Sequence, residues 1–216
     1  MGFIKVEDYK LTLQEVYKKL KREFDEDDDD FELLESMVNE ANEIAVPKAF
    51  YRESTVEFID GKAVIDGVKI ESDFVAEKLS GQKCVYPYAI TCGTELDDWS
   101  KKYTDFIEEF YADQIKELYF AKASVALRKE ISEKVGKCAS LNPGSLKMWQ
   151  IDGQKQLFEI IKEGNCGIKL MPSWLMVPHK SASGIFYRTD SGFENCSLCP
   201  RLNCPNRRAE YEYSGV

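Results

Sequence analysis

Apolar side chains recur at helical spacing in two stretches near the start of the chain. The first contains Leu13, Val16, Tyr17, Leu20 and Phe24, and the second contains Leu34, Met37, Val38, Ala41 and Ile44. Steps of three and four residues place such side chains on one face of an α-helix, and Pro47 would end the second helix. The acidic run Asp25–Asp30 between them is typical of a hydrated connector. The pattern therefore predicts a helical N-terminal extension over residues 1–50.

The pattern changes to strand-like between Ser54 and Ile70. β-Branched and aromatic residues are interrupted there by Asp60-Gly61 and Asp66-Gly67, which predicts two successive antiparallel hairpins. Residues 84–92 form another apolar run with strand character. Pro87 lies inside this run and has no N–H to donate, so it indicates an edge strand or a bulge.

The rest of the chain adds two helices and further strand-like runs. A helix of about three dozen residues should begin after Thr94 and end near Gly136. A turn at 142–145 follows, and then a shorter helix with Asp152 as N-cap and Gly164 at its end. Runs of strands separated from runs of helices predict an α+β fold, with a mainly antiparallel twisted sheet covered by helices. Residues 51–216 would form this second unit, with a Cys-rich tail at its C-terminal end.

An ordered series of motifs carries a resemblance to a known family. It consists of Pro143-Gly144, a helix, Gly167-Ile168-Lys169-Leu170, Ser173 to Pro178, and Ser181-Ala182-Ser183-Gly184. This series resembles the C-terminal reactivation domain of cobalamin-dependent methionine synthase. A fainter likeness extends upstream through residues 90–93 and a helix that contains Asp113, so it covers about the last two thirds of the chain.

The resemblance implies a stand-alone reactivation subunit that supports reductive methylation of cob(II)alamin on a cobalamin-dependent methionine synthase. In that family the methyl group comes from S-adenosylmethionine and the electron from flavodoxin. The partner would be a cobalamin-bearing methionine synthase or another corrinoid protein, with flavodoxin or ferredoxin as reductant. The implied ligand-binding residues are Ser140, Asn142, Pro143, Gly144, Ser145, Ser181, Ser183, Gly184 and Phe193. No catalytic side chain is implied.

The chain departs from the family pattern at positions that would contact the ligand. The family has an Arg three residues before the Pro, where this chain has Ser140, so a forked charge-assisted anchor for a carboxylate is lost. Ser145 replaces a Tyr, and Phe193-Glu194 corresponds to a Tyr-Tyr pair. Binding of S-adenosylmethionine, and with it an enzymatic methyltransferase role, therefore stays open at this point.

Three cysteines near the C-terminal end have the spacing of metal ligands. Cys196, Cys199 and Cys204 form a C-x2-C-x4-C pattern, and Cys166 is the first choice for a fourth ligand. Thiolate sulfur favours zinc and iron–sulfur centres. Two alternative functions follow: an iron–sulfur electron-transfer protein that reactivates a corrinoid methyltransferase, and a zinc-stapled interaction module. Free thiols are the third interpretation of the pattern.

Charge and composition exclude several classes of protein. The 216 residues carry a net charge of -9, with 18 basic and 31 acidic residues in 1–133, and 11 basic and 7 acidic residues in 134–216. Nucleic-acid binding needs a concentrated basic face, which this composition does not indicate. A hydrolase triad is not indicated either, because His179 has no Gly-x-Ser-x-Gly partner. No run of eighteen apolar residues and no signal peptide is present, so we expect a cytoplasmic protein that does not enter a membrane.

Overall fold

The computed structural model describes residues 2–6, 9–204 and 207–212. The α-helices are α1 (Leu13–Leu20), α2 (Phe31–Ile44), α3 (Asp73–Leu79), α4 (Thr94–Ser100), α5 (Phe106–Val135) and α6 (Gln154–Ile161). The strands are β1 (Gly2–Lys5), β2 (Lys48–Tyr51), β3 (Ser54–Ile59), β4 (Lys62–Ile65), β5 (Val68–Lys69), β6 (Cys84–Thr91), β7 (Cys138–Leu141), β8 (Lys169–Leu170), β9 (Met176–Val177) and β10 (Ser181–Arg188). Short 3₁₀ helices lie at η1 (Ile151–Gly153), η2 (Lys162–Gly164) and η3 (Asn195–Ser197).

Strand β6 lies at the centre of the main sheet. It pairs with β10 along one side, and with β2 and β3 along the other. Strand β7 extends the sheet beyond β10, and the pairings are antiparallel. Within the described residues eight strands form this sheet, while β8 and β9 pair separately. Alternate residues of each strand therefore face opposite sides of the sheet.

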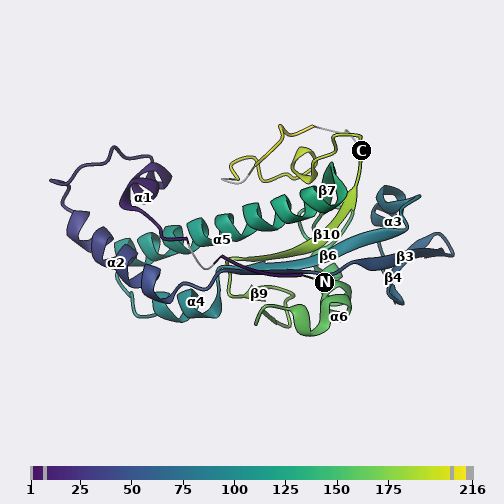
Figure 1. Cartoon of the computed structure of the whole chain (residues 1–216), viewed down its shortest axis with the longest axis horizontal. Helices are drawn as coiled ribbons and strands as arrows, with labels where there is room; N and C mark the ends of the chain where they lie inside the picture. The colour runs from purple at the N-terminus through teal and green to yellow at the C-terminus, as the bar shows by residue number, and fades with distance from the viewer. Residues whose placement is uncertain (1, 7–8, 205–206, 213–216) are drawn as a thin grey trace.

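Two different layers cover the faces of this sheet (Figure 1). Helix α5 packs on one face, where Leu127 and Ile131 lie in one buried cluster with Tyr86 and Tyr88. Helix α6 packs on the other face, where Ile161 lies in a cluster with Phe50 and Ala89 of the sheet. The prediction of an α+β fold with a helix-covered antiparallel sheet is confirmed. In the part of the chain that is described, no helix is both long and apolar enough to cross a bilayer.

The first two helices share a core with the rest of the chain. Residues of α1 and α2, including Val16 and Leu34, are buried in one cluster with Leu96 of α4 and Ile115 of α5. The sequence pattern did not predict β1, which pairs with β2 and so ties the N-terminal end into the sheet. Residues 1–50 therefore contribute strands as well as the predicted helices.

The interpretation of Pro87 as a sign of an edge strand or a bulge is wrong, because β6 is central. The carbonyl oxygen of Pro87 accepts a hydrogen bond of 3.1 Å from the Arg52 N–H, and Arg52 lies between β2 and β3. In an antiparallel strand the N–H and C=O of one residue point to the same side. The missing N–H therefore faces the gap between two neighbouring strands, where the ladder is already interrupted.

The single long helix expected after Thr94 is divided into α4 and α5. Trp99 and Tyr103 turn inward at the break, where the Trp99 Nε1–H and the Tyr103 hydroxyl donate to Glu40 of α2 at 2.9 and 3.1 Å. Helix α5 then starts anew, because the Asp105 carboxylate accepts hydrogen bonds from the N–H groups of its first turn. The predicted end near Gly136 is confirmed, with Gly136 at φ 79°.

The shorter elements agree with the sequence except at the two ends of α6. The predicted end of this helix at Gly164 is wrong, because α6 ends at Ile161 and Gly164 lies in the 3₁₀ turn η2. Both Asp-Gly pairs form the turns of antiparallel hairpins, β3–β4 and β4–β5, with positive φ at each residue. The helix expected from Asp152 begins at Gln154 instead, after the 3₁₀ turn η1. Asp152 lies inside that turn and is not the N-cap of α6, so this detail of the prediction is wrong.

Candidate functional site

A buried polar cluster lies where β7 leaves the sheet. The Asn142 Nδ2 donates to the Tyr88 hydroxyl at 2.6 Å and to the Ser183 carbonyl at 2.8 Å. The Ser140 hydroxyl donates to the Asn142 Oδ1 at 3.4 Å. Burial raises the pKa of the Tyr88 hydroxyl, which therefore stays protonated near neutral pH. These contacts join β6, β7 and β10 on the α5 face of the sheet.

Gly184 is required by the close approach of its neighbours in this cluster. A Cβ at this position would lie 2.4 Å from the Leu141 carbonyl oxygen, 2.6 Å from the Asn142 Nδ2 and 2.9 Å from the Tyr88 hydroxyl. No side chain larger than hydrogen fits there without a shift of backbone. The Gly of the Ser-Ala-Ser-Gly motif therefore has a structural reason in this fold.

The Pro-Gly bend is held by backbone hydrogen bonds. The Gly144 N–H donates to the Trp149 carbonyl at 2.8 Å, and the Ser145 N–H donates to the Asn142 carbonyl at 3.3 Å. Pro143 is buried, Ser145 is partly exposed and Gly144 is exposed at φ 77°. Neither of the two pockets described below is lined by residues of this bend.

The two serines of the Ser-Ala-Ser-Gly motif have different surroundings. The Ser183 hydroxyl donates to the side-chain oxygen of Gln154, at the start of α6, and is buried. The Ser181 hydroxyl donates to the Thr91 hydroxyl at 3.0 Å. The structure thus gathers Ser140, Asn142 and Gly184 around Tyr88, whereas the Ser183 hydroxyl turns to the opposite face of the sheet.

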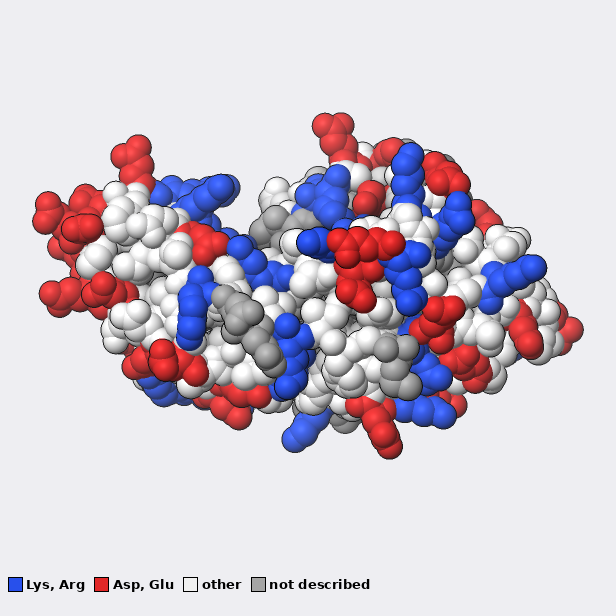
Figure 2. Space-filling view, in the orientation of Figure 1, with Lys and Arg blue, Asp and Glu red and all other residues white. Residues whose placement is uncertain are grey.

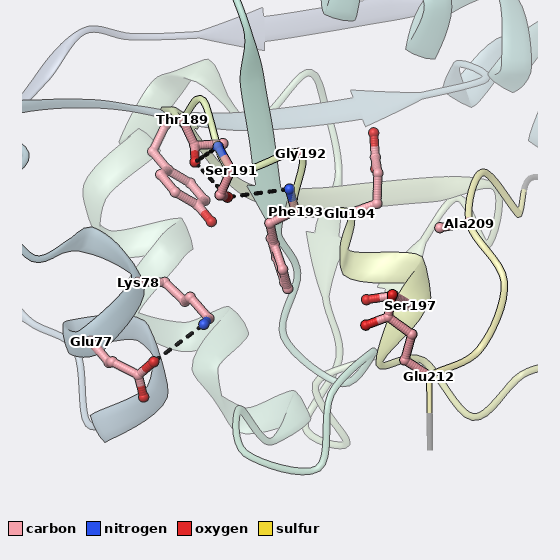
Figure 3. A pocket seen from close by; sticks show the side chains of 11 residues that line it. Glu77, Lys78, Thr189, Ser191, Gly192, Phe193, Glu194, Ser197, Ala209 and Glu212 are labelled. Atoms are coloured by element: carbon pink, nitrogen blue, oxygen red, sulfur yellow. Dashed lines mark hydrogen bonds and ion pairs between the residues drawn. The ribbon is translucent and has the colours of Figure 1, made fainter. Parts of the chain in front are cut away.

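A pocket of about 440 Å³ opens between α3, the end of β10 and the C-terminal segment, which we define as residues 194–204 and 207–212. Figure 3 shows the Phe193 ring pointing into it, between Lys78 on one side and Ser197 with Glu212 on the other. The Lys78 ammonium lies 5.4 Å from the centroid of the Phe193 ring and 3.2 Å from a carboxylate oxygen of Glu77. We call this cavity the Phe193 pocket.

Hydroxyl groups line the β10 end of the Phe193 pocket (Figure 3). The Thr189 and Ser191 hydroxyls lie 2.8 Å apart, and the Phe193 N–H donates to the Ser191 hydroxyl at 3.3 Å. Tyr187 forms part of the wall, and burial raises the pKa of its hydroxyl to about 12. An aromatic ring and several hydroxyls suit a small polar ligand with a flat ring. Of the carboxylates in the lining, Glu77 is paired with Lys78, and Glu194 is paired with Arg128 and Arg208.

A second, smaller pocket of about 200 Å³ lies between α5 and the C-terminal segment. It is lined by Glu117, Phe120, His179, Lys180, Ser181, Arg201 and Cys204. The Lys180 ammonium pairs with Asp113 at 2.9 Å and with Glu117 at 3.2 Å. Burial alone would lower the pKa of Lys180, but these two carboxylates raise it above its ordinary value, so the amine is held as a cation.

The four predicted metal ligands are not brought together. Cys166 lies with Phe50 and Ile161 between the sheet and α6, whereas Cys204 lines the pocket beside α5 on the opposite face. Among the described residues no group of three or more His, Cys, Asp and Glu side chains is arranged to hold a metal ion. Burial also raises the pKa of the Cys166 thiol to about 11, which favours the neutral form over a ligating thiolate. The structure does not place Cys166 beside the other three cysteines, and the zinc and iron–sulfur interpretations find no support among the described residues.

Arg207 organises the segment in which the metal was expected. Its guanidinium donates hydrogen bonds to five backbone carbonyls, those of Cys196, Cys199, Arg201, Leu202 and Ala209, at 2.6–3.2 Å. These acceptors surround one side chain, because a guanidinium carries five N–H donors in a fixed plane. The loop that holds Cys196 and Cys199 is thus shaped by an arginine.

Sequence reasoning missed most residues of the Phe193 pocket. Glu77 and Lys78 belong to α3, more than a hundred residues before Phe193, and no local motif marks them. Arg207 was missed as well, although it lies within the tail singled out for its cysteines. Phe193, Ser181 and Cys204 are the predicted residues that line a pocket.

Comparisons with known proteins give a fold but no family. No protein-family model and no curated protein matches the sequence. A solved structure, the crystal structure of the MetH reactivation domain bound to AdoHcy, is similar with a TM-score of 0.61. The two are 16% identical, and the match covers 89% of this chain and 80% of that one. The chain therefore has a fold of the reactivation-domain type. At this identity the likeness shows the architecture alone.

Proposed function

We propose that this chain is a reactivation component for cobalamin-dependent methionine synthase and that it binds an S-adenosylmethionine-type ligand. The observation that carries the proposal is the structural likeness to the MetH reactivation domain, which extends over 89% of the chain. That neighbour is bound to AdoHcy, the product form of the methyl donor. The ordered motifs from Pro143 to Gly184 support the same conclusion, since they surround β7 and β10 of the shared fold.

The ligand site that we propose is the Phe193 pocket. Its volume of about 440 Å³ falls within the range of small-molecule sites, about 300–1,000 Å³. The Phe193 ring would stack on the adenine, and the hydroxyls of Thr189 and Ser191 would bind the ribose. The Glu212 carboxylate at the rim would attract the sulfonium and amino groups, which are positively charged.

The remaining predicted residues have a supporting role in this proposal. Ser140 is buried beside Asn142, so it does not replace the arginine that the family uses at this position to hold the ligand carboxylate. Ser140, Asn142 and Gly184 would instead fix β7 and β10 behind the pocket. Arg128 of α5 lies 3.6 Å from Glu194, which lines the pocket.

In the proposed reaction the chain positions a methyl donor against a cofactor on another protein. Reduced cobalt of the partner's cobalamin would attack the sulfonium methyl carbon, the carbon–sulfur bond would break, and S-adenosylhomocysteine would leave. One electron from an external reductant is needed before this step. The chain would contribute orientation and exclusion of competing nucleophiles.

Calorimetric titration with S-adenosylhomocysteine and with S-adenosylmethionine tests the ligand. We expect saturable binding, and we expect Phe193→Ala to weaken it about tenfold or more because the stacking surface is lost. Phe58→Ala is the matched control, since Phe58 is 43% exposed on β3 outside both pockets. Absence of saturable binding of either compound at millimolar concentration would refute the ligand assignment.

Turnover of a methionine synthase tests the proposed reactivation role. A cobalamin-dependent methionine synthase lacking its own reactivation domain becomes inactive as its cobalamin oxidises. Addition of this chain, S-adenosylmethionine and a reductant should restore turnover, and the Phe193→Ala variant should restore less. Equal inactivity with and without the chain would count against the reactivation role.

A further inference from the structure

Lys78 is the one cationic side chain among the described residues that line the Phe193 pocket. It belongs to the last turn of α3, and its side chain is 30% exposed. Figure 3 shows it on one side of the Phe193 ring, with Glu212 and Ser197 on the other. The pocket therefore presents a positive group on one wall and a carboxylate on the opposite wall.

Two aromatic rings hold the Lys78 ammonium at the pocket. Its Nζ lies 5.2 Å from the centroid of the Phe74 ring and 5.4 Å from that of the Phe193 ring. The centroids of the two rings are 6.4 Å apart. The faces of aromatic rings attract a cation without cancelling its charge, and an ammonium carries three N–H donors. Lys78 is thus held in place while donors remain available for an anion.

The acidic groups near Lys78 leave it accessible to a ligand. Glu77 lies 3.2 Å from the ammonium, but it is the preceding residue of α3 and its side chain is 70% exposed. Consecutive residues do not face each other on a helix, and exposed ion pairs contribute little stability. Glu194 pairs instead with Arg128 and Arg208, at 3.6 and 3.1 Å. A ligand anion that enters the pocket can therefore displace Glu77 from Lys78.

The net charge of -9 does not exclude an anionic group from this pocket. Figure 2 shows acidic side chains gathered at the end of the molecule that holds α1 and α2, whereas basic and acidic side chains are interspersed over the half that holds α3. Exposed charges that lie more than about 10 Å apart are largely screened by salt. The charge of the group that the pocket accepts is therefore decided by the residues that line it.

An adenosine derivative with an amino-acid tail carries both charges that these two walls would attract. Its carboxylate is negative, its ammonium is positive, and both are bonded to the same carbon. We infer that Lys78 binds the carboxylate of the ligand while Glu212 attracts the ammonium. Lys78 then selects adenosine derivatives that retain a carboxylate. This inference rests on the proposed function and names the part of the ligand that the pocket distinguishes.

Calorimetric titration with two related ligands tests the role of Lys78. S-adenosylhomocysteine is compared with its decarboxylated analogue, in which hydrogen replaces the carboxylate and the rest of the molecule is the same. The wild-type chain should bind S-adenosylhomocysteine about tenfold more tightly, because the analogue lacks the charge-assisted hydrogen bond. Lys78→Met should weaken binding of S-adenosylhomocysteine about tenfold and change binding of the analogue by less than about twofold, so that the preference disappears.

Two further variants separate charge from position in the fold. Lys78→Arg keeps a cation at this wall and should retain most of the preference for the carboxylate. Lys69→Met is the matched control, because Lys69 also forms an exposed pair, with Glu71 at 3.1 Å, and lines neither pocket. It should leave the binding of both ligands unchanged. Unchanged thermal melting of each variant shows that the fold is intact.

The possible outcomes separate the role of Lys78 from the proposed function. No binding of S-adenosylhomocysteine to the wild-type chain would overturn the ligand assignment and this inference together. A preference for the carboxylate that Lys78→Met leaves unaltered would overturn the role of Lys78 alone. Equal binding of both ligands by the wild-type chain would do the same. An equal loss for both ligands in Lys78→Met would show that the lysine only supports the Phe193 ring, which also overturns the carboxylate contact.

Discussion

In both the polar cluster around Tyr88 and the loop around Arg207, one polar side chain holds several backbone segments together. The two regions differ in how far apart these segments lie in the sequence. Asn142 joins Tyr88, 54 residues away, and the Ser183 carbonyl, 41 residues away. Arg207 reaches carbonyls no more than 11 residues from itself. The first arrangement requires the whole sheet, whereas the second can form or open within the C-terminal segment.

This difference predicts how each region responds to change. Disruption of the cluster around Tyr88 should lower the stability of the whole fold, because it is buried between β6, β7 and β10. Disruption of the Arg207 loop should open only the C-terminal segment, because the hydrogen-bond donor and its acceptors belong to one short stretch of chain.

The largest effect is expected for Gly184→Ala. The added methyl group would lie 2.4 Å from the Leu141 carbonyl oxygen, so β7 and β10 would have to separate. We expect the free energy of unfolding to fall by about 3 kcal/mol in urea titration. Gly192→Ala is the control, because a Cβ there meets nothing within 4 Å and only the φ of 71° is unfavourable. A loss of about 1 kcal/mol is expected for the control, and equal losses for both variants would contradict the crowding at Gly184.

The next effect concerns the hydrogen bonds of Asn142. Asn142→Ala removes the donor to the Tyr88 hydroxyl and to the Ser183 carbonyl, and leaves both buried. We expect a loss of about 2 kcal/mol of unfolding free energy. In the background of Tyr88→Phe the same substitution should lower the unfolding free energy by less, because the hydroxyl that would be left without its hydrogen bond is no longer present. Strictly additive losses would show that the two side chains are not coupled.

The sequence predicted those parts of the fold whose cause is local. The turns at Asp60-Gly61 and Asp66-Gly67 follow from backbone preferences of the residues themselves, and so does the end of α5 at Gly136. Pro87 misled because its missing N–H is harmless only next to the gap between β2 and β3. The interruption lies opposite Pro87 itself, because β2 and β3 keep one register on β6 and Arg52 pairs with Pro87 there. Which segment lies opposite Pro87 is known only from the assembled sheet.

In the candidate site, too, local patterns are visible in the sequence, whereas contacts between distant segments are not. Spacing alone suggested that Cys196 and Cys199 bind a metal. Spacing does not reveal that Arg207, a few residues later, donates hydrogen bonds to the carbonyl oxygens of both cysteines. The fold also places Cys166 on the other side of the sheet, which no local pattern shows. Lys78 and Glu77 of the Phe193 pocket come from α3, so that pocket exists only after folding.

A moderate effect is expected from pH at the buried thiol of Cys166. Its pKa rises from an ordinary value of 9.0 to about 11 because burial disfavours the thiolate. The unfolded chain therefore loses this proton first, so the stabilisation is complete below pH 9 and is lost as the pH rises toward 11. We expect Cys166→Ala to reduce the decline of unfolding free energy over this range by roughly 1–2 kcal/mol. An identical decline in the variant would mean that other groups cause it.

The smallest effect on global stability is expected for Arg207→Ala, although its local effect should be large. The five carbonyl acceptors would turn to water, and the segment that holds Cys196 and Cys199 would open. We expect unfolding free energy to change by less than about 0.5 kcal/mol, since the loss is confined to exposed loop. Alkylation of Cys196 and Cys199 by iodoacetamide, followed by mass spectrometry, should accelerate about three- to tenfold.

Two internal references make the Arg207 experiment decisive. Cys92 and Cys166 are buried in the core and should stay unlabelled in the native variant, which separates local opening from unfolding. Arg208→Ala is the matched control, because the Arg208 guanidinium pairs with the Glu194 carboxylate at 3.1 Å and should leave labelling of Cys196 nearly unchanged. Faster labelling of all four cysteines in Arg207→Ala would show that the C-terminal segment supports the whole fold, and the contrast with the cluster around Tyr88 would then fail.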